Sequence, residues 1–317
     1  MTESLEPGRD PRYLLRHATL RQIEIFEAVA RLGSFTRAAE ELHLTQPTVS
    51  TQIKNLAEAA GMPLYEQISR RIYLTEAGQM LARTCREVID GLTNVQMSLD
   101  DLRGLKRGRL RLSVITTAKY FAPLALGDFA ARYPDIELEL KVSNRDALIR
   151  RIEENLSDLY IIGHVPDVSM DLEMIPFAPN PLCVIAHRDH PLAGERDIPL
   201  ARIAEEPFIL RETGSGIRRR VEDYFARHGL KLQGRLVLEG NEAIKHAVAG
   251  RLGVSVVSEH ALNLEHHDGP LIKLDVTGFP LESYWNIVYP RGKELSVIAQ
   301  AFLSFLKANG GDYLRIG

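Results

Sequence analysis

One uninterrupted helical repeat, from Glu76 to Leu102, separates two parts of the chain that follow different patterns. Its apolar residues lie alternately four and three apart, a period of 3.5 that is typical of a helix pairing with another helix. Packing on the chain's own body is the alternative, but a helix this long exceeds what one domain face needs. We predict a dimerising helix in which Cys85 is a small buried apolar residue. Its stripe consists of Leu81, Cys85, Val88, Leu92, Val95, Leu99 and Leu102.

The segment before this repeat, from Thr19 to about Leu74, is helical with short breaks. Thr19 and Gln22 fit a capping box at the start of a first helix, and Gly33 ends that helix. The residues expected on its buried face are Leu20, Ile23, Phe26, Val29 and Ala30.

Two further helices follow at close spacing. Ser34 can cap a helix from Phe35 to Leu42, whose small alanines would let another helix approach. Thr45 can cap the next helix, which has Pro47 in its first turn. Two helices joined by so short a turn form the helix-turn-helix geometry.

The third helix has an apolar face, with Val49, Ile53 and Leu56, and a polar face of short side chains. Such a polar face suits a DNA major groove, where Gln46 could pair with an adenine edge and Lys54 with phosphate or guanine. A merely solvated face is the alternative, which the position after a tight turn disfavours. The residues expected to contact DNA in the helix-turn-helix are Ser34 and Thr36 at the start of its second helix, and Gln46, Pro47, Thr48, Ser50, Thr51 and Lys54 on the third.

The segment from Pro63 to Leu74 places Arg70 and Arg71 between two apolar runs. This pattern predicts a two-stranded wing whose arginines lie over phosphates or in the minor groove. We therefore expect an all-α winged helix-turn-helix domain over residues 19–76, followed by a linker helix and hinge over residues 77–108.

Beyond Arg109, short β-branched strands alternate with amphipathic helices, which is typical of an α/β fold with parallel sheets. We predict two similar Rossmann-like halves that bind a ligand between them, at strand ends and helix N-termini. The expected strands are 110–115, 136–143, 159–163, 182–187, 207–210, 235–238, 254–258 and 285–289; the expected helices are 121–133, 145–155, 242–249, 294–307 and one after Gly216.

A glycine-rich loop, Thr213 to Gly216, opens one of these helices, so its backbone N–H groups could face an anion. The helix then begins with three arginines, where acids are normally favoured, and Arg211 precedes the loop. A bound anion would explain these cations; an ordinary turn with solvated arginines is the alternative. The residues expected to bind this effector are Thr116, Thr117, Lys119, Asn144, His164, Arg211, Thr213, Gly214, Ser215, Asn241 and Glu242.

No catalytic motif emerges, since the sequence lacks a Walker A loop, a nucleophile elbow, a His-Glu-x-x-His pair and a dinucleotide fingerprint. Cys85 and Cys183 lie far apart, and His266 and His267 are typical of an exposed loop rather than of metal ligands. We therefore expect no enzyme, no catalytic residue, no cofactor and no metal.

Charge and targeting signals narrow the class further. With 39 Lys and Arg against 42 Asp and Glu, the net charge of −3 excludes a uniformly basic nucleic-acid coat but allows a local basic patch. The first residues lack the basic and apolar regions of a signal peptide, and no apolar stretch is long enough to span a membrane. We expect a cytoplasmic protein with no membrane partner.

The run FTRAAEELHLTQPTVS at residues 35–50, followed by LTEAG at 74–78, resembles the LysR-type transcriptional regulators, and the resemblance extends from residue 19 over the rest of the chain. The runs RETGSG at 211–216 and NEAIK at 241–245 are similar to one branch, the CbbR regulators of Calvin-cycle (RuBisCO) operons. Thr48, His164 and Arg251 depart from that pattern.

The resemblance implies a periplasmic-binding-protein-like effector domain over residues 109–309, with subdomain I about 109–180 and 281–309 and subdomain II about 181–280. It implies a transcriptional activator that binds promoter DNA as a homodimer and tetramer (a dimer of dimers) and works with RNA polymerase. The implied effector is a phosphorylated Calvin-cycle metabolite or NADPH. Control of another metabolic operon and a solute-binding protein are the alternatives; the latter has no use for a helix-turn-helix.

Overall fold

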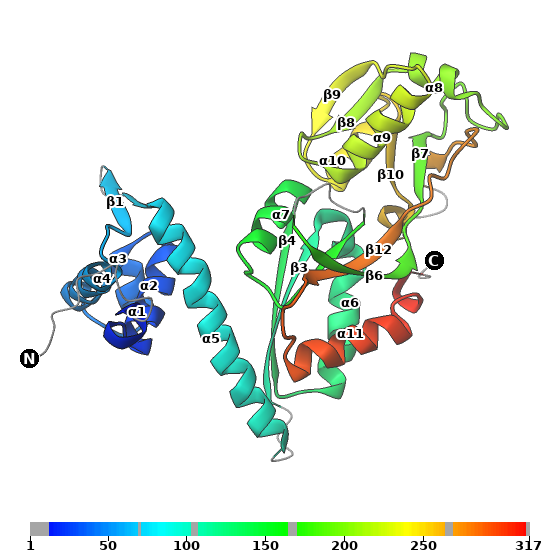
Figure 1. Cartoon of the computed structure of the whole chain (residues 1–317). Coiled ribbons are helices and arrows are strands. Elements are labelled where there is room, and N and C mark those ends of the chain that lie inside the picture. Colours follow the sequence, from blue (N-terminus) through cyan, green and yellow to red (C-terminus); the bar gives the residue numbers. More distant parts are fainter. Residues whose placement is uncertain (1–12, 69–70, 103–106, 164–169, 264–268, 315–317) are drawn as a thin grey trace, which may run out of the picture. The chain divides into compact units, whose positions relative to one another are not determined.

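The computed structural model describes residues 13–68, 71–102, 107–163, 170–263 and 269–314 of the 317-residue chain. These residues form two compact units, Met1–Gln96 and Met97–Gly317. Figure 1 traces both units along the sequence. Among the described residues, no helix is long and apolar enough to cross a membrane.

The first unit is a small helical domain with a hairpin. The predicted capping box is present, because Thr19 accepts from the backbone of Gln22 and the Gln22 side chain accepts from Thr19 N. Ser34 and Thr45 cap the next two helices as predicted. The elements are α1 (Tyr13–His17), α2 (Leu20–Leu32), α3 (Phe35–Glu41), α4 (Gln46–Ala60), β1 (Tyr65–Ile68) and β2 (Arg71–Leu74). Helix α1 was not expected from the sequence.

The core of this unit corrects the predicted face of α2. Leu20 is 59% exposed, whereas Ile25 and Ala28 are buried beside Phe26 and Val29. In the first turn of α2 the buried residue is Gln22, whose side chain is held by the capping box. The buried face of the helix therefore does not include Leu20. On α4, the predicted apolar residues Val49, Ile53 and Leu56 are all fully buried.

The predicted wing is a two-stranded antiparallel hairpin, in which Tyr65 lies opposite Leu74 and Ile68 opposite Arg71. Ser69 and Arg70, at its expected tip, lie outside the described residues. Helix α5 (Glu76–Leu102) follows with the predicted bounds. Glycine is required at Gly78 in its first turn, because a Cβ there would collide with the Leu64 carbonyl.

The predicted stripe of α5 divides into two parts. Cys85 is buried in the core of the first unit, as expected, and burial raises the pKa of its thiol to about 12. Leu92, Val95 and Leu99 are instead 53%, 57% and 45% exposed. The Leu102 side chain lies outside the description. The stripe therefore presents an apolar surface that this chain leaves open to solvent.

The second unit contains two α/β halves. In the first half, a five-stranded sheet has the order β4-β3-β5-β12-β6, with β3 parallel to β4 and β5, and β12 antiparallel to β5 and β6. Helices α6 and α11 contribute to the core on one face, and α7 packs on the other. These elements, visible in Figure 1, are β3 (Gly108–Ile115), α6 (Ala122–Arg132), β4 (Ile136–Ser143), α7 (Arg145–Glu153), β5 (Leu159–Ile162), β6 (Leu172–Pro179), β12 (Tyr284–Pro290) and α11 (Val297–Asn309).

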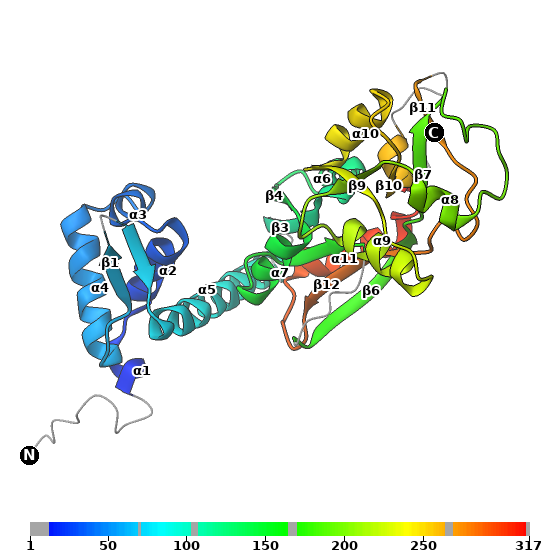
Figure 2. The ribbon, with the colours of Figure 1, turned by 90° about the horizontal axis from the view of Figure 1, so that it is seen from above.

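The second half is inserted between β6 and β12. Helices α9 and α10 cover opposite faces of its strands, because alternate residues of β7 join two separate cores (Figure 2). The elements are β7 (Leu182–His187), α8 (Leu200–Glu205), β8 (Phe208–Arg211), α9 (Gly216–Arg227), β9 (Gly234–Leu238), α10 (Asn241–Ala249), β10 (Ser255–Ser258) and β11 (Leu271–Lys273), with short 3₁₀ helices η1 (Thr116–Tyr120), η2 (Glu259–Leu262) and η3 (Asp312–Leu314).

The expectation of purely parallel sheets is wrong in part. The β10-β7-β11 sheet is antiparallel, whereas β8 and β9 pair in parallel. The chain crosses between the halves twice, near residues 180 and 282, where Asn180 N donates to Ser283 O and Leu182 N to Leu281 O. Strands that enter a sheet through these crossings run against their neighbours. The sequence also missed α8, β6 and β11.

Candidate functional site

The outer face of α4 carries most of the predicted DNA contacts on exposed positions. Gln46, Pro47, Thr48, Thr51 and Lys54 are exposed. The Thr51 hydroxyl donates to Pro47 O at 2.9 Å and the Lys54 ammonium lies 3.9 Å from Glu58, so this face is polar and its cation is only loosely paired.

The remaining residues predicted to contact DNA lie in different settings. Ser50 is half-buried, and Ser34 is occupied as the cap of α3, with its hydroxyl 3.3 Å from Arg37 N. Thr36 is exposed in the first turn of α3, and Arg71 is exposed at the start of β2. The helix and the wing therefore offer solvent-facing donors and cations.

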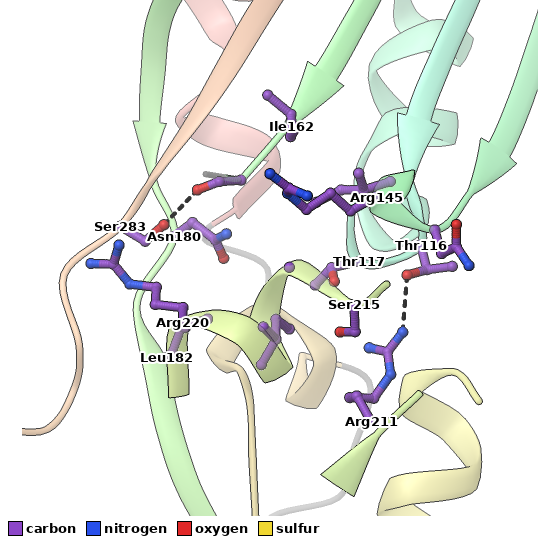
Figure 3. A pocket seen from close by; sticks show the side chains of 15 residues that line it. Thr116, Thr117, Arg145, Ile162, Asn180, Leu182, Arg211, Ser215, Arg220 and Ser283 are labelled. Atoms are coloured by element: carbon purple, nitrogen blue, oxygen red, sulfur yellow. Dashed lines mark hydrogen bonds between the residues drawn. The ribbon is translucent and has the colours of Figure 1, made fainter. Parts of the chain in front are cut away.

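A pocket lies in the cleft between the two halves of the second unit (Figure 3). The empty volume of this pocket is about 500 Å³, part of which is open to solvent. Five predicted residues line it, with contributions from both halves. They are Thr116, Thr117, Asn144, Arg211 and Ser215.

The N-termini of α7 and α9 meet at this pocket. Asn144 caps α7 by accepting from Ala147 N at 2.9 Å, and Ser215 caps α9. The α9 loop approaches α7 closely, since a Cβ on Gly214, whose φ is +89°, would lie 2.6 Å from the Asp146 carboxylate. Two sets of helix N–H groups thus converge from opposite halves, an arrangement that favours an anion.

Arg211 crosses the cleft but is already fully engaged. Its side chain is 3% exposed and makes two hydrogen bonds to the Glu212 carboxylate, at 2.7 and 2.9 Å. It also donates to Asn241 Oδ1 and, at 3.3 Å, to Thr116 Oγ1 of the first half. Burial pushes the pKa of Glu212 upward, but the hydrogen bonds and charge of Arg211 outweigh burial and hold it below its ordinary value. Glu212 therefore neutralises Arg211.

Arg145, which the sequence analysis missed, is a different kind of cation. It is the first residue of α7, lines the pocket and is only 8% exposed. Its guanidinium lies 3.3 Å from Asp146, but its Nε has no acceptor among the described residues. In Figure 3 it extends across the pocket towards Asn180. The signal was available, because an arginine directly after a predicted N-cap occupies the positive end of a helix.

Other lining residues were also missed. Arg220 of α9 reaches the crossing strand, where it donates to the Glu282 carbonyl, and lies beside Ser283 in Figure 3. Asn180 and Ser283 belong to the two crossings and also line the pocket. The sequence signals that predicted site residues mark helix N-termini. They carry no information on where the two crossings lie, so Asn180 and Ser283 could not be placed at the pocket.

The other described residues of the predicted effector set do not line the pocket. Glu242 joins Tyr120 at 2.6 Å, Lys245 at 3.0 Å and Lys119 at 3.7 Å. Burial raises the pKa of Glu242, but hydrogen bonds from Tyr120 and Lys245 outweigh burial and lower it overall. Thr213, Gly214 and Asn241 also do not line the pocket. His164, His266 and His267 lie outside the described residues.

No group of three or more His, Cys, Asp or Glu in the described part of the chain is arranged to hold a metal ion. Cys183 is buried, and burial raises the pKa of its thiol to about 12. The arginines and helix N-termini that line the pocket offer the chemistry of anion binding.

Two family descriptions match the chain. Residues 20–79 match "Bacterial regulatory helix-turn-helix protein, lysR family", and residues 103–311 match "LysR substrate binding domain". The HTH-type transcriptional activator CmpR of Synechocystis is 50% identical over 93% of this chain and 97% of its own length. The RuBisCO operon transcriptional regulator of Acidithiobacillus ferrooxidans is 46% identical over 94% of this chain and 96% of its own length.

Solved structures agree with this assignment. The regulatory domain of Synechocystis CcmR, in complex with 2-PG, is 49% identical with a TM-score of 0.62, and the match covers 64% of this chain and 97% of that domain. Full-length CbnR complexed with its target DNA shares the fold, with a TM-score of 0.63 at 21% identity, over 92% of this chain and 99% of CbnR. The chain belongs to the LysR family of transcriptional regulators.

Proposed function

We propose that this chain activates carbon-fixation genes and senses a short phosphorylated acid of the 2-phosphoglycolate type. The target class is supported by relatives whose names are those of RuBisCO operon regulators, at 46% and 45% identity and nearly full coverage. The ligand class is supported by the CcmR regulatory domain in complex with 2-PG, which is 49% identical. We propose no catalytic role.

DNA recognition is assigned to the polar face of α4 and to the wing. Gln46 at the start of α4 is placed to read a base edge, while Lys54 and Arg71 would contact phosphates. The complete proposed set is Ser34, Thr36, Gln46, Pro47, Thr48, Ser50, Thr51, Lys54, Arg70 and Arg71. Pairing through the exposed stripe of α5 would present two such readers to one promoter. A tetramer and a contact with RNA polymerase extend this proposal.

The effector is assigned to the pocket between the two halves. The observation that carries this assignment is the buried guanidinium of Arg145 at the meeting point of two helix N-termini, where its Nε has no acceptor among the described residues. Arg220 lines the same pocket near Ser283. A ligand with a phosphate at one end and a carboxylate at the other would meet one arginine at each end.

A binding experiment tests both assignments. Duplex DNA from upstream of the operon beside this gene is titrated with the protein, with and without 2-phosphoglycolate, and compared with a shuffled duplex. We expect a preference for the promoter duplex at moderate salt that Gln46→Ala reduces, and a shift in its affinity or footprint with ligand. Equal affinity for both duplexes would contradict the regulator assignment, and a response to NADPH alone would contradict the ligand class.

A further inference from the structure

We propose that Arg145 is the anchor for the effector's anionic group, and that Asp146 is an internal substitute anion that the effector displaces. This inference rests on the proposed effector function. It differs from the expectation that Arg211 holds the anion, and it assigns a binding role to a residue pair that the sequence motifs did not single out.

Arg145 has the properties of an anion site that is incompletely filled. It is 8% exposed, so its charge is largely removed from water, and its Nε has no acceptor among the described residues. Its guanidinium pairs with the carboxylate of the adjacent residue, Asp146, at 3.3 Å. A buried donor without an acceptor is costly, and charge-assisted hydrogen bonds to a phosphate or carboxylate remove that cost.

Asp146 can leave, whereas the corresponding acid of Arg211 cannot. The Asp146 side chain is 48% exposed, so its carboxylate can turn towards water and remain solvated. Glu212 is only 12% exposed and holds Arg211 through two hydrogen bonds, so its displacement would strand a buried carboxylate. An incoming anion therefore competes more easily for Arg145 than for Arg211.

Displacement of Asp146 by an anion would also change the contact between the two halves. The Asp146 carboxylate lies directly against Gly214 in the loop that opens α9 of the other half. Gly216 is next to the same place, since a Cβ on it would lie 3.3 Å from Arg145 Cδ. An anion on Arg145 would therefore replace a carboxylate that faces the α9 loop with a ligand that its N–H groups can bind. This links ligand occupancy to the contact between the halves.

The test compares three substitutions in the full-length protein. Arg145→Gln should weaken 2-phosphoglycolate binding by about 10- to 100-fold, because it removes charge-assisted hydrogen bonds. Asp146→Asn removes the competitor and should tighten binding by about 2- to 5-fold, the range of a half-exposed ion pair. Arg150→Gln, which removes an exposed arginine from the same helix, is the matched control and should leave binding unchanged.

Affinity is measured by calorimetry and by the fluorescence of Trp285, the single tryptophan of the chain. The emission of the buried Trp285 and its urea midpoint without ligand should be the same for all variants, which confirms that the second unit folds in each. If Arg145→Gln does not fold, Arg145→Lys and Asp146→Asn provide the test. Wild-type affinity in Arg145→Gln or Arg145→Lys, or weaker binding in Asp146→Asn, would overturn the exchange alone. Wild-type protein that ignores millimolar 2-phosphoglycolate would overturn the proposed ligand class and the exchange with it.

Discussion

The Arg211–Glu212 pair should behave as one unit whose halves cannot be removed singly. The Glu212 side chain is 12% exposed. Arg211→Met would remove its charged partner and leave the Gly240 N–H, at 3.4 Å, as a remaining hydrogen-bond donor. Breaking one side of a buried ion pair costs about 3–5 kcal/mol, and the low exposure of both side chains calls for no reduction of that range. Glu212→Gln should cost a similar amount because it leaves Arg211 unneutralised.

The double variant Arg211→Met, Glu212→Gln contains no unpaired buried charge. It should therefore be destabilised by much less than the sum of the two single changes, with a coupling energy of at least about 2 kcal/mol. For a unit of this size we expect each single change to lower the urea midpoint by about 1 M or more.

Trp285 makes the measurement specific to the second unit. It is the only tryptophan and is fully buried, so its emission follows the unfolding of this unit. Arg202→Met, which replaces an exposed arginine of α8, is the control and should leave the midpoint unchanged. Additive losses in the double variant would refute the reasoning, because they would mean that Arg211 and Glu212 contribute independently.

Three further predictions follow from the structure. Arg71→Ala should weaken binding to all DNA sequences alike and lower the salt slope by about one, measured by anisotropy titrations at several salt concentrations; a loss confined to one base position would contradict a phosphate contact. Leu92→Ala should weaken pairing by about 2 kcal/mol, because burying the half-exposed leucine in each of two copies would contribute about 1 kcal/mol per copy. Met80→Ala, a similarly exposed position of α5 outside the stripe, is the control and should leave pairing unchanged. Sedimentation measures the dissociation constant of both variants. Burial lowers the pKa of His260 below its ordinary 6.5, so the unfolded chain takes up the proton at a higher pH than the folded chain does. The second unit should therefore lose stability as pH falls below about 6.5. His260→Gln should reduce the pH dependence of the urea midpoint, and an unchanged dependence would contradict this role of His260.

Local chemistry made the first unit largely predictable. The caps Thr19, Ser34 and Thr45, and the bounds of α5, are set by residues within a few positions of each boundary. The face of α2 was wrong at Leu20 because a capping interaction, not periodicity, decides what the first turn buries.

The pocket was only partly predictable because half of its lining comes from long-range topology. Asn144 and Ser215 could be found as caps of predicted helices. Asn180 and Ser283 lie on the two crossings, which are brought together by pairing between segments about a hundred residues apart. Arg211 and Arg145 are each followed by an acidic residue, so the sequence does not show which arginine is neutralised. That depends on burial in the folded cleft, where Glu212 is 12% exposed and Asp146 is 48% exposed.

Helix α5 serves two structures at once. Ala82 and Cys85 belong to the core of the DNA-reading unit, while Leu92, Val95 and Leu99 further along the same helix remain open to a partner. If pairing stabilises helix α5, it therefore also stabilises the core of the first unit, to which the same helix contributes. By mass action, the apparent stability of the first unit would then rise with protein concentration, so that dilution would destabilise the DNA-binding unit as well as dissociate the dimer.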